Sequence, residues 1–315
     1  MTYSSGGLIQ ATDYNTIAWG TTSGGTYTAS PNNLAYVWGN GSGRFGYGQS
    51  TSSFTSLSSG TTVTATQWTG VFGAVNSTAS HQGSSAASLP SSVTAGSTIT
   101  FLSATATALA NINGNVGAVS GALSDSAATT YTGPTTWQTN TTVTHTVTFG
   151  SADAARYFFN AGGKLKLSFS VPTGNARANE WNDTATKCGT ITIGYLNTTQ
   201  AAGVGAPAPT TLLNANNGGY WNTTTGGVIH FKQFADTAPY TANYIQTTAT
   251  WSGTTANGGY PVITLTTVFA DVQDNTFQQS VGVAASASLV VSSPPTTYLT
   301  NTWGTPTVSG SATGA

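Results

Sequence analysis

The sequence predicts a mainly β protein, in which a C-terminal antiparallel β-sandwich with a short helical insert follows an extended N-terminal region with short helices. In the second half of the chain, apolar residues alternate with Thr and Ser, and turn residues separate the alternating segments. Before residue 136 the apolar residues recur at helical spacing instead. We therefore divide the chain into an N-terminal assembly region, residues 1–135, and a sandwich, residues 136–315.

An internal repeat marks the N-terminal region. Residues 7–17 align with residues 61–71, and the aligned pairs include Tyr14 with Trp68 and Ile17 with Val71. Each copy predicts an extended segment followed by a short helix with one apolar face, because its apolar residues are three and four positions apart. Thr12 and Thr66 are the predicted N-caps.

Three further segments complete the N-terminal region. Residues 38–49 contain glycine at nearly every second position, which permits positive φ and close approach of the backbone. Residues 77–97 are rich in Ser and Ala and predict a linker or extended arm. Residues 103–114 predict a short helix that ends at Gly114, before a boundary near Pro134.

The second half of the chain predicts at least seven antiparallel strands, because its alternating segments are rich in β-branched and aromatic residues. These segments are residues 143–149, 164–171, 190–196, 228–234, 244–251, 262–271 and 281–290. One helical insert is expected at residues 151–163, where Ser151 can cap the helix and a glycine pair ends it. A β-sandwich with one helix at a corner is the simplest architecture for this pattern.

The composition favours a subunit that associates with others. Charged residues make up 5% of the chain, against roughly 25% in ordinary soluble domains. With a net charge of -1, the chain has neither the basic field that binds nucleic acid nor a polybasic face for a membrane. We expect no membrane insertion and no secretory signal. A nearly neutral surface also removes the repulsion that keeps free proteins apart.

Candidate catalytic and metal-binding groups are few. Glu180 with Asp183, and Asp271 with Asp274, are the two acidic pairs that could serve a glycosidase or a calcium ion. Neither pair has the full spacing of a calcium loop, so turn chemistry is the favoured interpretation. We therefore expect no catalytic residue, no metal and no cofactor.

The histidines and the cysteine also favour structural roles over catalysis or metal binding. The histidines are far apart in sequence at His81, His145 and His230, which favours structural roles over a triad or a zinc site. Cys188 is the only cysteine, so an internal disulfide is excluded and a small buried side chain is expected.

Aromatic residues in turns are the best candidates for ligand contact. Tyr220, Trp221 and Tyr260 lie beside Asn and Gly, a combination that can stack on sugar rings and supply hydrogen bonds. The competing interpretation places such residues in the core or in a subunit interface.

Several segments resemble structural proteins of tailed bacteriophages, especially those of marine bacteria and cyanobacteria. The segments that carry this resemblance are residues 8–16, 43–49, 63–68 and 149–167, within the part of the chain that spans about its first half. Such proteins are described as virion structural or tail-fibre-like. The resemblance implies a place in the virion, with assembly in the host cytoplasm and release by lysis, and it implies no reaction.

We therefore expect a subunit of a tail, baseplate or neck appendage, in contact with itself as a homotrimer and with other virion proteins. The expected assembly interface consists of Tyr14, Ile17, Trp38, Arg44, Tyr47, Trp68 and Phe72. One alternative is a receptor- or carbohydrate-binding module that contacts a host surface glycan. A second is a capsid decoration protein, and a depolymerase is the enzymatic interpretation that the acidic pairs leave open.

Overall fold

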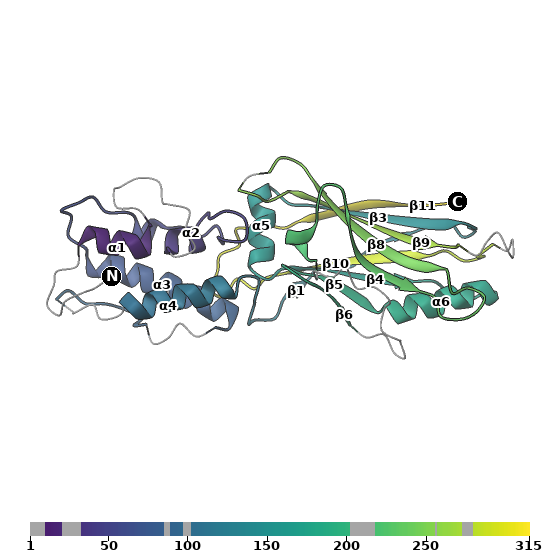
Figure 1. Ribbon diagram of the computed structural model, residues 1–315, viewed down its shortest axis with the longest axis horizontal. Helices are drawn as coiled ribbons and strands as arrows, with labels where there is room; N and C mark the ends of the chain where they lie inside the picture. The colour runs from purple at the N-terminus through teal and green to yellow at the C-terminus, as the bar shows by residue number, and fades with distance from the viewer. Residues whose placement is uncertain are drawn as a thin grey trace.

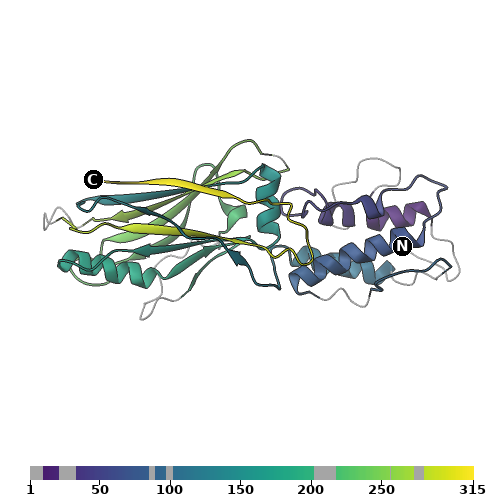
Figure 2. The same ribbon diagram turned by 180° about the vertical axis from the view of Figure 1, so that it is seen from behind.

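The computed structural model describes residues 10–20, 33–84, 89–96, 102–201, 218–255, 257–272 and 280–315. These residues form a helical region and a β-sandwich that lie end to end (Figures 1 and 2). The mainly β class and the antiparallel sheets agree with the sequence prediction. The N-terminal region differs from it, because its described residues form a bundle of helices and not an extended arm.

The described part of the helical region contains four α-helices and one 3-10 turn. They are α1 (Ala11–Ala18), α2 (Leu34–Trp38), η1 (Ser52–Phe54), α3 (Ala65–Gln82) and α4 (Leu102–Gly114). Their apolar faces meet in one core, where the ring of Tyr14 packs edge-on against Trp68 with the centroids 5.4 Å apart. The repeat therefore joins its two helices directly, although its residues 7–9 lie outside the described residues.

Helix α3 begins earlier and ends later than the sequence indicates. Its N-cap is Thr64, whose hydroxyl accepts a hydrogen bond from the Gln67 amide at 3.3 Å, while the Gln67 side chain accepts one from the Thr64 amide at 2.8 Å. This reciprocal capping box places Thr66 inside the helix, and the same shift puts Thr12 inside α1. The helix includes residues 77–82 of the predicted linker and ends at Gly83, which has φ +70°.

The sandwich consists of two antiparallel sheets. The first has the order β1-β10-β4-β5-β6, with β2 also on β10, and the second has the order β11-β3-β9-β8-β7. Their bounds are β1 (Ser124–Asp125), β2 (Thr129–Thr132), β3 (Asn140–Thr148), β4 (Lys164–Ser170), β5 (Thr190–Ile193), β6 (Thr198–Ala201), β7 (Val228–Phe234), β8 (Tyr244–Ser252), β9 (Val262–Ala270), β10 (Ser286–Ser293) and β11 (Thr307–Gly314). A 3-10 turn, η2 (Tyr220–Asn222), precedes β7.

Alternation explains why these segments are strands. Along β3, Val143 and Val147 are fully buried, while the threonines between them face outward and are half-buried. A strand with period two can bury one face in this way and leave the other to water. The sandwich core lies between the two inner faces.

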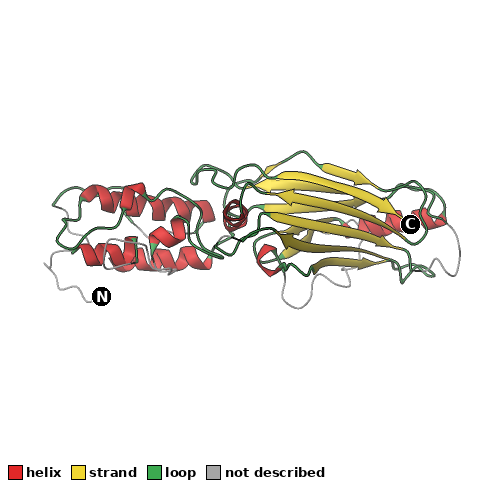
Figure 3. Ribbon diagram, turned by 90° about the horizontal axis from the view of Figure 1, so that it is seen from above, coloured by secondary structure: helices red, strands yellow, loops and turns green. Residues whose placement is uncertain are grey.

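Two helices flank the sheets. The predicted helix α5 (Ala152–Asn160) stands across the end of the sandwich that faces the helical region, and Figure 3 shows it nearly end-on between the two. The second, α6 (Ala176–Cys188), lies where the sequence predicts turns. Its sequence is rich in Asn, Thr and Asp, which disfavour helix interiors, but the cap by Asn175 and burial of Trp181 outweigh that preference.

Four strands are missing from the sequence prediction, and one strand is displaced. Strands β1 and β2 pair with β10, so the sheets begin before residue 136. Strand β10 begins at Ser286, although the alternation predicts a start at Val281. Strands β6 and β11 contain almost no large apolar residue, so no hydrophobic pattern marks them.

The two cores are distinct but are joined at one side chain. Trp38, at the end of α2, is half-buried and packs against both the helical core and the sandwich core. Its indole N–H donates to the Ser50 carbonyl at 2.8 Å. Among the described residues, no helix combines the length and the apolar character needed to cross a bilayer.

Candidate functional site

The seven residues of the expected assembly interface lie mostly inside the chain. Those with buried side chains are Tyr14, Ile17, Tyr47, Trp68 and Phe72. Trp38 is half-buried and Arg44 is exposed. The buried five are core residues, so their contacts are made within this chain. Assembly through the helical region stays a prediction, and it would have to use residues other than these five.

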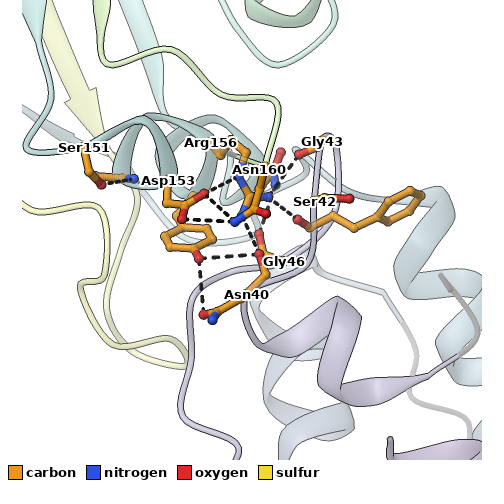
Figure 4. A network of polar contacts seen from close by, with 12 residues as sticks. Asn40, Ser42, Gly43, Gly46, Ser151, Asp153, Arg156 and Asn160 are labelled. Atoms are coloured by element: carbon orange, nitrogen blue, oxygen red, sulfur yellow. Dashed lines mark hydrogen bonds and ion pairs between the residues drawn. The ribbon is translucent and has the colours of Figure 1, made fainter. Parts of the chain in front are cut away.

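The glycine-rich loop, residues 39–48, docks on α5 through a single buried arginine (Figure 4). Arg156 has no exposed side-chain surface, and its guanidinium donates to the carbonyls of Phe45 at 2.6 Å and Gly43 at 3.2 Å, and also to that of Asn40. Its Nε donates to the Asp153 carboxylate at 2.9 Å. Loop and helix are therefore joined by charge-assisted hydrogen bonds in a site shielded from water.

Neighbouring residues of α5 extend this contact. Asn160 donates from its side-chain amide to the Gly46 carbonyl at 3.0 Å. Asn257, in the turn between β8 and β9, donates to both oxygens of Asp153 at 3.2 Å and accepts from the Gly43 amide through its carbonyl at 2.5 Å. Two segments that are far apart in sequence, the glycine-rich loop and the turn at Asn257, thus meet at one helix.

Glycine is required in this loop for a steric reason. Gly48 has φ +68°, and a Cβ on it would lie 2.4 Å from the ring of Tyr157 on α5. Gly46 has φ +92°, and a Cβ there would lie 2.6 Å from the Asn40 carbonyl oxygen. The sequence prediction of close backbone approach is therefore explained by a contact within the chain.

Two further connections hold the regions together. The Gln49 side chain accepts from the Thr300 amide at 2.8 Å and donates to the Thr300 carbonyl at 2.9 Å, as an antiparallel strand would. At the end of α3, the His81 ring contacts the Ala161 carbonyl with Nε2 at 2.9 Å. Burial lowers the pKa of His81, so the ring is neutral and Nε2 is the donor.

The aromatic turn residues also gather at α5. Tyr220 is 1% exposed and stacks on Phe159 of α5 at 4.2 Å, and its hydroxyl accepts from the Tyr260 amide at 3.0 Å. Trp221 donates from its indole to Asn160 at 3.3 Å. The structure thus brings the three predicted glycan-contact residues together, but Tyr220 belongs to the core.

One aromatic pair in this cluster remains partly exposed. Tyr260 stacks on Trp251 with the ring centroids 4.5 Å apart and the planes 21° from parallel. Both rings are half-buried. The sequence places Trp251 among the aromatic residues that could stack on a sugar, and it lies near the end of strand β8 and not in a turn.

The pair Glu180 and Asp183 lies on α6 and gains a third carboxylate from Asp236, after β7. Their oxygens lie within 4.8 Å of one another. The ammonium of Lys187 lies between two of them, bonded to Asp183 and, at 2.6 Å, to Asp236. Lys187 therefore supplies the positive charge of this cluster, and a metal ion would have to displace it.

Glu180, the remaining carboxylate of that cluster, differs from the two aspartates in its surroundings. Glu180 is 9% exposed, and its Oε1 has no hydrogen-bond partner among the described residues. Burial raises its pKa, whereas the hydrogen bond from Lys187 lowers the pKa of Asp236. The cluster acts as an ion-pair network that fastens α6 to the loop after β7.

The structure describes only one residue of the second acidic pair. Asp271 is buried and accepts from Arg177 of α6 at 2.6 Å, so it forms an ion pair inside the sandwich. Asp274 lies outside the described residues.

The strand histidines are buried, as expected for structural roles. His145 on β3 contacts the Thr129 carbonyl with Nε2 at 3.1 Å. His230 on β7 contacts the hydroxyl of Thr198 with Nδ1 and that of Thr223 with Nε2, each at 3.0 Å. The Thr198 hydroxyl also donates to the Gly218 carbonyl at 2.7 Å, and the Thr223 hydroxyl to the Gly219 carbonyl at 3.2 Å. Burial lowers the pKa of His230 to about 4.

Cys188 is fully buried at the end of α6, in agreement with the sequence prediction. Burial raises the pKa of its thiol well above its usual value. A thiol that is both buried and protonated is a packing residue.

Arg156, the central residue of the junction, is not among the residues predicted from the sequence. The available signal was a charged residue within the hydrophobic helix of a chain that has only 7 Lys and Arg residues in total. Its acidic neighbour Asp153 is three positions earlier and forms the local ion pair.

Comparison with protein-family models, with curated proteins and with solved structures gave no match. The resemblance to phage structural proteins is therefore an expectation from the quoted segments alone.

Proposed function

We propose that this chain is a structural subunit of a bacteriophage particle, part of a tail, baseplate or neck appendage. In this proposal the helical region attaches to the particle and the sandwich projects from it. The observation that carries the proposal is the junction at Arg156, which fixes two unlike halves end to end (Figures 1 and 4). A subunit that bridges two positions in an assembly needs such a fixed geometry.

The use of charge supports the same proposal. Within the described residues, four of the 7 Lys and Arg residues form ion pairs with carboxylates of the chain, namely Arg156, Lys166, Arg177 and Lys187. Few charges are therefore left to repel a neighbouring subunit. The outer faces of strands such as β3 and β9 carry threonines, which can pack against another protein without leaving a buried charge.

The test is incorporation of full-length variants into particles, by complementation of a phage that lacks the chain. Ala106 and Ala110 are exposed one turn apart on the outer face of α4, and lysines at both positions would place charge on the proposed attachment end. We expect A106K/A110K to be folded but reduced at least tenfold in purified particles, measured by quantitative mass spectrometry.

The matched control places the same two charges at the opposite end of the molecule. Thr173 and Thr241 are exposed in loops at the end of the sandwich that lies away from the helical region. T173K/T241K should be incorporated as the unmodified chain is. Equal incorporation of both variants, or the absence of the unmodified chain from particles, would contradict the proposal.

The half-buried pair of Trp251 and Tyr260 favours glycan binding as a second candidate function, because a partly exposed aromatic ring can stack on the apolar face of a sugar. A glycan array would test it with the unmodified chain and with Trp251→Ala. Tyr298, which is 47% exposed and lies outside this cluster, provides the control substitution Tyr298→Ala. Signal that Trp251→Ala abolishes and Tyr298→Ala preserves would support a carbohydrate-binding role.

A further inference from the structure

Strand β11 forms an open edge of the sandwich. It is last in the five-stranded sheet and pairs with β3 along its whole length, from Thr307 opposite Thr148 to Gly314 opposite Thr141. Among the described residues, no strand pairs with its other side. That side consequently presents a row of backbone N–H and C=O groups, which is a template for a further strand.

The opposite edge of the same sheet is protected. Strand β7 has a register shift between Ile229 and Phe231, and Lys232 lies over the ring of Tyr244 at 3.6 Å. Bulges and lysines are the devices by which proteins prevent edge-to-edge pairing. Strand β11 has an unbroken register, no charge and no proline over its 8 residues.

The sequence of β11 is close to a palindrome. Residues 307–313 are Thr-Val-Ser-Gly-Ser-Ala-Thr, which is symmetric about Gly310 except that Val308 is exchanged for Ala312. Two copies placed antiparallel about Gly310 would therefore match hydroxyl with hydroxyl and small apolar residue with small apolar residue.

The chain already uses such hydroxyl pairs between its own strands. The side chains of Thr130 and Ser288 are hydrogen-bonded at 2.7 Å, and those of Thr132 and Ser286 at 2.9 Å. Cross-strand pairs of this kind stabilise a sheet.

The side-chain directions in β11 suit the same arrangement. Val308 and Ala312 are half-buried and pack against the core, whereas Ser309 and Ser311 are exposed on the outer face. The inner face is closed by Tyr131, whose ring fills the space beside Gly310. The outer face is smooth and uncharged, and two chains of net charge -1 meet with almost no repulsion.

We propose that a second copy of this chain pairs with β11, antiparallel about Gly310, so that the two five-stranded sheets become one continuous sheet. The paired strands would extend over about 27 Å, since a strand rises about 3.4 Å per residue. This contact has a two-fold axis, so it predicts a dimer or an even-numbered assembly and differs from the homotrimer expected from the sequence. It is independent of the proposed function.

The experiment measures the mass of the full chain in solution by light scattering after size-exclusion chromatography. The unmodified chain should be a dimer that dissociates on dilution. In S309K/S311K, each lysine faces a lysine of the other copy, and we expect the dissociation constant to rise about tenfold or more. S309E/S311E should behave in the same way, and mixing the two variants should restore a mixed dimer.

The control is T264K/T266K, which places two lysines on the central strand β9 and should leave the dimer unchanged. Thermal unfolding of each variant at a concentration where it is monomeric shows that the fold is kept. The proposal would be overturned if the unmodified chain were a monomer even at a concentration 100-fold above that of the light-scattering experiment. A trimer, like-charge variants that dimerise normally, or failure of the two variants to associate when mixed would also overturn it.

Discussion

The helical region and the β-sandwich are built from similar small polar residues but are stabilised in different ways. The sandwich is held by long ladders between strands and by a core that contains Trp137, Trp181 and Trp303, all nearly inaccessible to solvent. The helical core is smaller and contains a larger share of alanine. The helical region therefore depends on its connection to α5, whereas the sandwich supplies its own stability.

Replacement of Arg156 should separate the helical region from α5 and have the largest effect on stability. Arg156→Met leaves three backbone carbonyls without their buried donor and removes the ion-pair partner of Asp153, which keeps its bonds from Asn257; we expect a loss of about 3–5 kcal/mol of the free energy of unfolding. Calorimetry should then resolve two transitions, with the helical region melting first. Arg44→Met, in the same loop but exposed, should keep a single transition.

Acid should weaken the sandwich through His230. Its pKa is about 4 in the folded chain and 6.5 in the unfolded chain, so between these values the unfolded chain binds a proton that the folded chain does not. The contribution of His230 to the free energy of unfolding is fully present above pH 6.5. It is lost as the pH falls to 4, and the loss is on the order of 3 kcal/mol.

Burial lowers the pKa of His145 and His81 as well, so the slope with pH will not vanish when one histidine is replaced. Denaturant titrations at pH 7 and pH 4.5 should show a smaller loss for His230→Gln than for the unmodified chain. An equal loss in both would show that His230 takes up its proton without unfolding.

Gly48→Ala tests the contact from the side of the loop. A Cβ at Gly48 meets the ring of Tyr157 in addition to the strain of a positive φ, and we expect a loss of about 2–3 kcal/mol. Gly43→Ala carries the strain alone, since no atom lies within 4 Å of the position that its new methyl group would occupy, and should lose about 1 kcal/mol. Equal losses, measured by urea unfolding, would mean that the loop can move away from α5 at little cost in free energy.

Thr64→Ala should have the smallest effect and sharpen the distinction between the regions. Loss of the capping hydroxyl of α3 costs about 1 kcal/mol, and hydrogen exchange should rise in the helical region alone. Ser151→Ala removes the equivalent cap of α5, whose hydroxyl accepts from the Ala154 amide at 3.0 Å. Because α5 touches both regions, exchange should rise in both.

The sequence indicated the sandwich because period-two alternation reports a buried face directly, as in Val143 and Val147 of β3. It did not indicate β11, whose stability comes from pairing with β3 and not from burial. Helix α6 was missed for a related reason: Trp181 and Arg177 are buried by contacts with distant strands, which local propensity does not contain.

The contacts of the candidate site also could not be predicted, because they join residues that are far apart in sequence. The glycines of residues 39–48 indicated close approach of the backbone, but the approaching partner is Arg156, more than a hundred residues later. The aromatic turns at Tyr220 and Tyr260 were singled out individually, and their meeting at α5 depends on the fold of both sheets.

The bonds between Gln49 and Thr300 join residues that are 251 positions apart. During synthesis, the helices and the glycine-rich loop emerge first, yet their docking partners on α5 and at Thr300 emerge much later. The N-terminal region can therefore reach its final form only after nearly the whole sandwich has left the ribosome. Unfinished chains would lack the finished helical end, so in the proposed role of this chain only molecules whose synthesis is complete could attach to the particle.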